Sequence, residues 1–256
     1  MADQSLADKV VIITGAGGGI GREMCREFAQ EGAIIVLVGR TRETLETVAK
    51  KLRGNPPVVI PTDITQPAQV ERLVTEVVES CGRIDALINN AGGGVAPCAA
   101  EDTLYDDWIR MIDINLTATF NCCMAIGKQM IKQKSGKIVN ISSTAGTKGH
   151  PGMLHYSAAK AGVLSLTNNL AYSWADHNIC VNAVVPGLIA TPAMIKYGVT
   201  PASVREDGTE MPPLKLAPGP RDVSKLCGFL VSDAANMITG ESIPIRAWNP
   251  TDRFWS

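Results

Sequence analysis

Residues 10–21 read VVIITGAGGGIG, a β-branched run followed at once by a cluster of glycines. The run Val10–Ile13 predicts a buried strand, and apolar residues at helical spacing predict a helix over Gly21–Gln30. Glycines between a strand and a helix let the backbone approach a ligand closely. The start of the helix adds free N–H groups and a positive dipole end. The stretch therefore predicts a strand–turn–helix unit suited to a pyrophosphate.

The glycine spacing is GxxxGxG, formed by Gly15, Gly19 and Gly21, and not the GxGxxG of the commonest dinucleotide fingerprint. Taken alone, such a cluster is also compatible with a plain tight turn. As cofactor-binding candidates in this loop we take Gly15, Gly18, Gly19, Ile20 and Gly21.

Short apolar runs alternate with helical patterns along the rest of the chain. This alternation is typical of a parallel sheet with helices on both faces and right-handed crossovers. We therefore expect one α/β domain, a doubly wound Rossmann-like sheet. The expected strands are Val10–Ile13, Ala33–Val38, Val58–Ile60, Ile84–Ile88, Lys137–Ser142, Ile179–Val185 and Ser242–Ile245. The expected helices are Gly21–Gln30, Arg42–Leu52, Gln66–Glu79, Leu104–Gln133 (long enough to bend), Tyr156–Asp176 and Arg221–Val231.

Composition narrows the class of protein. The formal net charge of the 256 residues is -1, so we expect neither a nucleic-acid nor a membrane partner. No apolar run approaches the roughly 18 residues of a membrane span, and no secretory signal is visible. The seven cysteines form no CxxC pair, which favours reduced thiols in a cytoplasmic protein. The three histidines lack metal-binding spacing, so we expect no catalytic metal.

The second strand ends in Gly39 and Arg40, where many dinucleotide sites carry an acidic residue for the ribose hydroxyls. A guanidinium suits a phosphate instead. We therefore favour NADP(H) over NAD(H), although Arg40 could also be a solvated residue at a helix start.

Tyr156 and Lys160 are spaced i, i+4 and so share one face of a helix. A phenol has a pKa of about 10, and a neighbouring ammonium lowers it. The pair could then exchange a proton with an alcohol or ketone oxygen. Ser143, after the fifth strand, could hydrogen-bond the same oxygen, with Ser142 as its rival.

Four motifs together resemble the short-chain dehydrogenase/reductase family: Thr14–Gly21, Asn89–Gly92, Ser143, and Tyr156–Lys160. The resemblance runs from about residue 6 to about residue 245. It implies a nicotinamide-dependent oxidoreductase that interconverts a secondary alcohol and a ketone. A catalytically silent nucleotide-binding or scaffolding subunit on the same fold is the alternative.

The resemblance also implies roles for single residues. Tyr156 would be the acid/base and Lys160 would bind the nicotinamide ribose. Ser143, thirteen positions before Tyr156, would position the carbonyl, and Asn115 would hold a water in a proton relay. The further cofactor contacts that it implies are Asp63, Ile64, Asn90, Ala91, Gly92, Pro186, Gly187, Ile189 and Thr191.

Residues 192–220 are expected to form an apolar lid over a mostly apolar substrate. Local similarity over Ala175–Gly198 makes acyl thioesters one candidate; hydrophobic cyclic or aromatic ketones and steroids are others. Two departures from the family pattern stand out. Glycines 17 and 18 replace a frequent hydroxylated residue, which weakens the case for NADP(H). The tail, 246–256, replaces an Asp-Gly-Gly ending. Its Trp248, Phe254 and Trp255 are expected to dock on a neighbouring subunit or to close its site, with a frayed terminus as the alternative. A homotetramer is implied by the resemblance alone.

Overall fold

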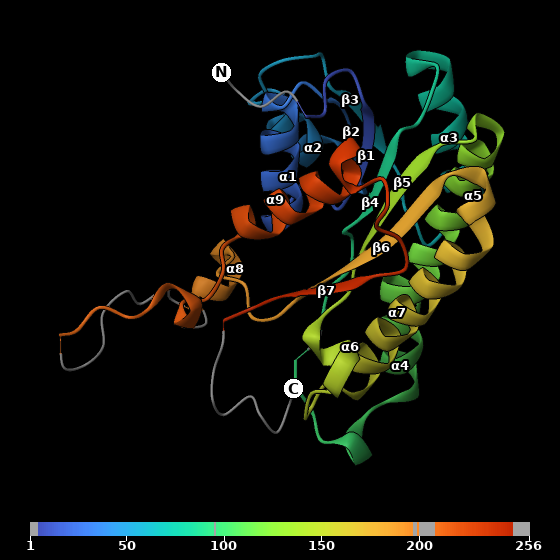
Figure 1. The fold of residues 1–256 in the computed structure, drawn as a ribbon. Coiled ribbons are helices and arrows are strands. Elements are labelled where there is room, and N and C mark those ends of the chain that lie inside the picture. Colours follow the sequence, from blue (N-terminus) through green and yellow to red (C-terminus); the bar gives the residue numbers. More distant parts are fainter. Residues whose placement is uncertain (1–4, 95, 197–198, 200–207, 248–256) are drawn as a thin grey trace.

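The computed structural model describes residues 5–94, 96–196, 199 and 208–247. Seven parallel strands form one sheet in the order β3-β2-β1-β4-β5-β6-β7 (Figure 1). The Rossmann-like, single-domain α/β fold expected from the sequence is confirmed. The strands are β1 (Val10–Thr14), β2 (Ile34–Gly39), β3 (Val58–Pro61), β4 (Ala86–Asn89), β5 (Gly136–Ile141), β6 (Ile179–Pro186) and β7 (Ser242–Ile245).

Helices cover both faces of this sheet (Figure 1). On β1, Val11 and Ile13 pack into the apolar cluster that holds α1, α2 and α9. Val10 and Ile12 pack into the opposite cluster, with α3, α5 and α7. Successive side chains of a strand point to opposite faces, so a strand buried on both sides is apolar throughout. The helices are α1 (Gly19–Gln30), α2 (Arg42–Ala49), α3 (Pro67–Cys81), α4 (Tyr105–Ile112), α5 (Ala118–Gln133), α6 (Thr144–Lys148), α7 (Leu154–Trp174), α8 (Pro192–Ile195) and α9 (Pro220–Val231).

The structure differs from the expected elements at three places. The long helix expected over Leu104–Gln133 is divided into α4 and α5 by a π-helical turn at Asp113–Thr117. Helices α6 and α8 were not expected, because five and four residues are too few for a helical period to show. Ser143 and Thr191 cap these short helices with their side-chain oxygens, which is a signal the sequence does contain.

The strand order reverses between β1 and β4, because β2 and β3 lie on one side of β1 and the later strands on the other. In open parallel sheets, ligands bind at such a switch point, beyond the carboxyl ends of the strands. The glycine loop follows β1 at this edge.

No helix in the described ranges is both long and apolar enough to cross a membrane.

Four thiols are wholly buried: Cys25, Cys122, Cys123 and Cys227. Burial raises the pKa of Cys25 and of Cys123 from 9.0 to about 12, and that of the other two further still. Above pH 9 the unfolded chain therefore loses thiol protons that the folded chain keeps, and stability falls as the pH rises. Buried Lys160 acts in the opposite direction. Its folded pKa of about 8 is below the ordinary 10.5, so its contribution to stability grows from pH 8 to 10.5.

The Tyr156 phenol, whose pKa is also raised by burial, adds to the effect of the thiols. We therefore expect a net difference of between three and four protons, or roughly 5 kcal/mol of stability lost per pH unit between about pH 9.5 and 10.5. Urea unfolding at several pH values, with reductant present, measures this slope. The double variant Cys122→Ala, Cys227→Ala should reduce it to about 2 kcal/mol per pH unit. An equally steep slope in that variant would show that these thiols do not cause it.

Candidate active site

The glycine loop combines unusual backbone angles with a close approach of helix α1 to the loop. Gly15 and Gly19 have φ of +66° and +31°, a region that side chains strongly disfavour. A Cβ on Gly21 would overlap the carbonyl oxygen of Gly15, so Gly21 lets α1 lie directly against the loop. Gly18 precedes α1 without a side-chain cap, which leaves the first N–H groups of the helix to a ligand or to water.

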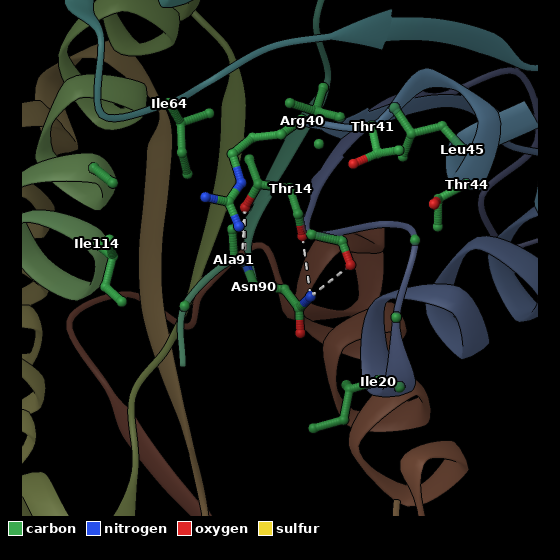
Figure 2. A pocket seen from close by; sticks show the side chains of 18 of the residues that line it. Thr14, Ile20, Arg40, Thr41, Thr44, Leu45, Ile64, Asn90, Ala91 and Ile114 are labelled. Atoms are coloured by element: carbon green, nitrogen blue, oxygen red, sulfur yellow. Dashed lines mark hydrogen bonds between the residues drawn. The ribbon is translucent and has the colours of Figure 1, made fainter. Parts of the chain in front are cut away.

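A cavity of about 840 Å³ opens over this loop (Figure 2). Its volume is in the range of small-molecule and cofactor sites. Many of the cofactor-binding candidates line it: Gly15, Gly18, Gly19, Ile20, Arg40, Asp63, Ile64, Asn90, Ala91, Gly92 and Thr191. The other candidates, Gly21, Tyr156, Lys160, Pro186, Gly187 and Ile189, are not among the lining residues; of these, Gly21, Lys160, Pro186 and Ile189 are buried.

Hydrogen bonds join the loops that follow β1 and β4. The hydroxyl of Thr14 accepts from the backbone N–H groups of Asn90, at 3.0 Å, and Ala91, at 2.9 Å. The amide of Asn90 donates to the carbonyl of Thr14 at 3.0 Å (Figure 2). These bonds hold the floor of the cavity at the switch point of the sheet.

Arg40 lies at one wall of the cavity and has no hydrogen-bond or ion-pair partner in the part of the chain that the structure describes. Thr41 and Thr44 line the cavity beside it. A Cβ on Gly17 would lie 2.7 Å from the methyl carbon of Thr44. Thr44 thus occupies the space that a hydroxylated residue at position 17 would need, and it brings its own hydroxyl to this wall.

The lining of the cavity also includes residues that the sequence analysis missed: Thr65, Arg110 and Ile114. Asp63 holds Thr65 by a bond of 2.8 Å from the threonine hydroxyl, and Thr65 lines the cavity with Arg110 and Ile114. Arg110 and Ile114 flank the start of the π-helical turn. Helical spacing alone does not reveal which side of a helix faces a ligand.

Ser143 and Ser142 have different hydrogen-bond partners in the structure. The Ser143 side chain hydrogen-bonds Tyr156. Ser142 is buried, and its hydroxyl donates to the backbone carbonyl of Lys160 at 2.8 Å. Ser143, and not its neighbour, is thus the serine that lies beside the tyrosine.

Tyr156 and Lys160 face one another, with the ammonium nitrogen 5.7 Å from the centre of the phenol ring. The expectation that the ammonium lowers the phenol pKa does not hold here. Burial raises the pKa of Tyr156, and the hydrogen bond with Ser143 only partly opposes this. Burial also lowers the pKa of Lys160 to about 8. Removal from water thus disfavours the charged form of both groups.

Asn115 lies inside the π-helical turn and is fully buried. Its amide nitrogen donates to the carbonyl of Gly93 at 2.9 Å, and its amide oxygen accepts from the N–H of Gly93 at 3.1 Å. The backbone carbonyl of Asn115 accepts from the Thr119 hydroxyl at 3.1 Å. The side chain thus fixes the loop after β4.

The loop after β6 closes the end of the site near Ser143. The N–H of Gly187 bonds the carbonyl of Ile245 at 2.9 Å, and Thr191 lies against Gly19. His155 is buried and accepts from the N–H of Tyr156 through Nδ1 at 3.0 Å, which is a structural role. In the expected lid, Ile195 and Leu214 are exposed, while 197–198 and 200–207 lie outside the described residues. Trp248, Phe254 and Trp255 of the tail also lie outside them.

The fold and site define a class. A Rossmann-like sheet with a glycine loop, an uncapped helix start and a cavity at its switch point fits a dinucleotide. The described residues contain no group of three or more His, Cys, Asp or Glu side chains able to hold a metal ion.

Comparison with known proteins agrees with this class. Residues 9–200 match the family model described as short chain dehydrogenase. The 3-oxoacyl-[acyl-carrier-protein] reductase FabG of Thermotoga maritima is 39% identical over 247 residues, covering 94% of this chain and 97% of that protein. The NAD-dependent glycerol dehydrogenase of Listeria innocua is 35% identical, covering 95% and 94%. A solved short-chain dehydrogenase/reductase from Burkholderia xenovorans has a TM-score of 0.86 at 33% identity, covering 95% and 96%.

The chain belongs to the short-chain dehydrogenase/reductase family. It is an NAD(P)(H)-dependent oxidoreductase that acts on an alcohol or ketone.

Proposed function

We propose that this protein is an NADP(H)-dependent reductase of mostly apolar ketones, with 3-oxoacyl thioesters as the first class to test. One observation carries the proposal. Ser143, Tyr156 and Lys160 meet at the same strand-end edge as the glycine-loop cavity. The carbonyl would bind between Ser143 and Tyr156, and the nicotinamide would lie beside it.

Each of these residues has a separate role in the reaction. The bound cofactor supplies the hydride. Ser143 donates a hydrogen bond to the substrate oxygen, and Tyr156 gives that oxygen its proton. The raised pKa of Tyr156 suits this direction, because the phenol is protonated at neutral pH. Lys160 places a positive charge near the phenolate that remains, and Asn115 holds the loop carrying Gly93 in place.

Two features support an apolar substrate and the thioester class. Leu188, in the loop after β6, and Ile195 and Leu214, in the expected lid, expose apolar side chains. Such side chains at the carboxyl ends of the strands suit an apolar substrate. Several relatives carry names of acyl-thioester reductases, such as the acetoacetyl-CoA reductase of an Acinetobacter species, 34% identical.

Arg40 supports NADP(H). Its unpaired guanidinium and the hydroxyl-bearing Thr41 and Thr44 would receive the phosphate on the adenosine ribose. Asp63 is the one carboxylate among the residues that line this cavity, and its side chain accepts from the Thr65 hydroxyl at 2.8 Å.

A panel containing acetoacetyl-CoA, cyclic ketones and aromatic ketones should be run with both NADPH and NADH. We expect reduction with NADPH, fastest on the thioester. For Arg40→Ala we expect kcat/KM for NADPH to fall about 30-fold, since a charge-assisted hydrogen bond contributes about 2 kcal/mol. The value for NADH should change less than about threefold.

Arg42→Ala is the matched control. Arg42 lies two residues further along, at the start of α2. It pairs with Glu46 at 3.7 Å and does not line the cavity. Equal loss with both cofactors in Arg40→Ala would contradict the assignment of NADP(H). No turnover of any ketone, despite tight cofactor binding, would contradict the proposed function.

A further inference from the structure

Three consecutive residues at the end of β5 each bind α7, the helix that carries the tyrosine and lysine. The carbonyl of Ile141 accepts from the Lys160 ammonium at 2.9 Å. The hydroxyl of Ser142 donates to the Lys160 carbonyl at 2.8 Å. The Ser143 side chain bonds Tyr156. Two of these contacts are made to groups that take part in proton transfer, the Lys160 ammonium and Tyr156. Ser142 bonds only to the backbone of Lys160.

Helix α6 holds the same stretch of backbone from another side. A Cβ on Gly146 would lie 2.6 Å from the carbonyl carbon of Lys160 and 2.8 Å from the nitrogen of Ala161. The main chain at Lys160 is thus held between the Ser142 hydroxyl and Gly146. A Cβ on Gly92 would in turn lie 3.3 Å from the ammonium nitrogen. Little space remains for the lysine to shift.

We propose that Ser142 is a positioning residue, whose hydroxyl fixes the main chain of Lys160 and thereby the place of its ammonium beside Tyr156. This rests on the proposed function. The ammonium is buried and the phenol is half-buried, and electrostatic interactions change steeply with distance where water is largely excluded. A small shift of the helical turn that carries Lys160 therefore alters proton transfer without any change in the reacting groups.

Few groups act on this pair in the described part of the chain. Burial is the one cause that lowers the pKa of Lys160. Tyr156 is affected by burial and by Ser143, and its neighbour His155 contacts its backbone N–H. If Ser142 stops holding the turn, the ammonium gains access to water and the pKa of Lys160 rises toward its ordinary value.

The test compares Ser142→Ala with Thr167→Val. Thr167 is a matched control because Asn140, also on β5, donates to its hydroxyl at 3.0 Å two turns further along α7. Both variants remove one buried hydrogen bond between the β5 segment and α7, but only Ser142→Ala releases the main chain of Lys160 from that bond. Ser142→Thr, which keeps the hydroxyl, tests for rescue.

The Lys160 pKa is measured in the cofactor-free protein by NMR of lysine labelled with carbon-13 at Cε, with Lys160→Met identifying the signal. We expect Ser142→Ala to raise this pKa by about one unit and to lower kcat about tenfold, with the KM for NADPH within about twofold. Ser142→Thr should restore both values. Thr167→Val should lower Tm to a similar degree and leave the Lys160 pKa unchanged.

An unchanged Lys160 pKa in Ser142→Ala, or an equal rise in Thr167→Val, would overturn the proposal. The NMR titration does not depend on turnover. Lack of ketone reduction by the wild-type protein would therefore contradict the proposed function, while the titration would still decide the role of Ser142.

Discussion

Tyr156→Phe is expected to lower turnover about 10³-fold, within the range usual for loss of a general acid. The substitution removes one oxygen and keeps the ring, so the packing of α7 is retained. The cavity lined by the glycine loop is not altered, since Tyr156 does not belong to its lining. The dissociation constant of NADPH, measured by fluorescence, should therefore stay within about threefold of wild type. Ketone reduction followed by NADPH absorbance gives the turnover.

Tyr172→Phe is the matched control for this prediction. Tyr172 lies on the same helix and is 93% exposed, so loss of its hydroxyl should change neither turnover nor binding. Turnover of Tyr156→Phe near that of wild type would show that the proton comes from another group, and the proposed mechanism would fail.

Gly21→Ala is expected to weaken NADPH binding at least 100-fold and to lower stability by about 2 kcal/mol, a usual cost of overpacking. The added methyl would overlap the Gly15 carbonyl and approach the Asn90 amide nitrogen to 2.7 Å. Both groups belong to the bonded floor of the cavity. Relief of the overlap must therefore displace the loop that would hold the pyrophosphate.

Gly18→Ala separates this effect from a general loss of loop flexibility. A Cβ on Gly18 meets no atom within 4 Å, and its φ of -127° suits alanine. Its free energy of unfolding, from urea titration, should stay within about 0.5 kcal/mol of wild type. Wild-type affinity for NADPH in Gly21→Ala would contradict the role assigned to this close approach.

Much of the architecture was predictable from local patterns. The apolar runs that begin near Val10, Ala33 and Ile179 each form a strand within one or two residues of the expected bounds. A strand buried on both faces must be apolar at every position, and this leaves a signal in a single sequence. The expected helix over Leu104–Gln133 failed at the π-helical turn, because one extra residue in a turn leaves no clear mark in the period.

The candidate site was predictable in its residue types but not in its contacts. The i, i+4 spacing predicted that Tyr156 and Lys160 share a helix face, and their side chains do face each other. The place of Thr44 in the cavity lining was not predicted, because its contact with Gly17 joins the starts of two different helices, α1 and α2. Pairings of this kind depend on how elements pack, which no local pattern records.

The amino-acid sequence by itself determined the alternation of strands and helices, the glycine loop and the chemical types at the strand ends, because each is set by residues near one another in the chain. The tertiary structure alone decided that Ser142 bonds the main chain of Lys160, and that burial raises the pKa of the Tyr156 phenol. Both outcomes depend on how far water is excluded where β5, α6 and α7 come together, and burial is a property of the assembled fold.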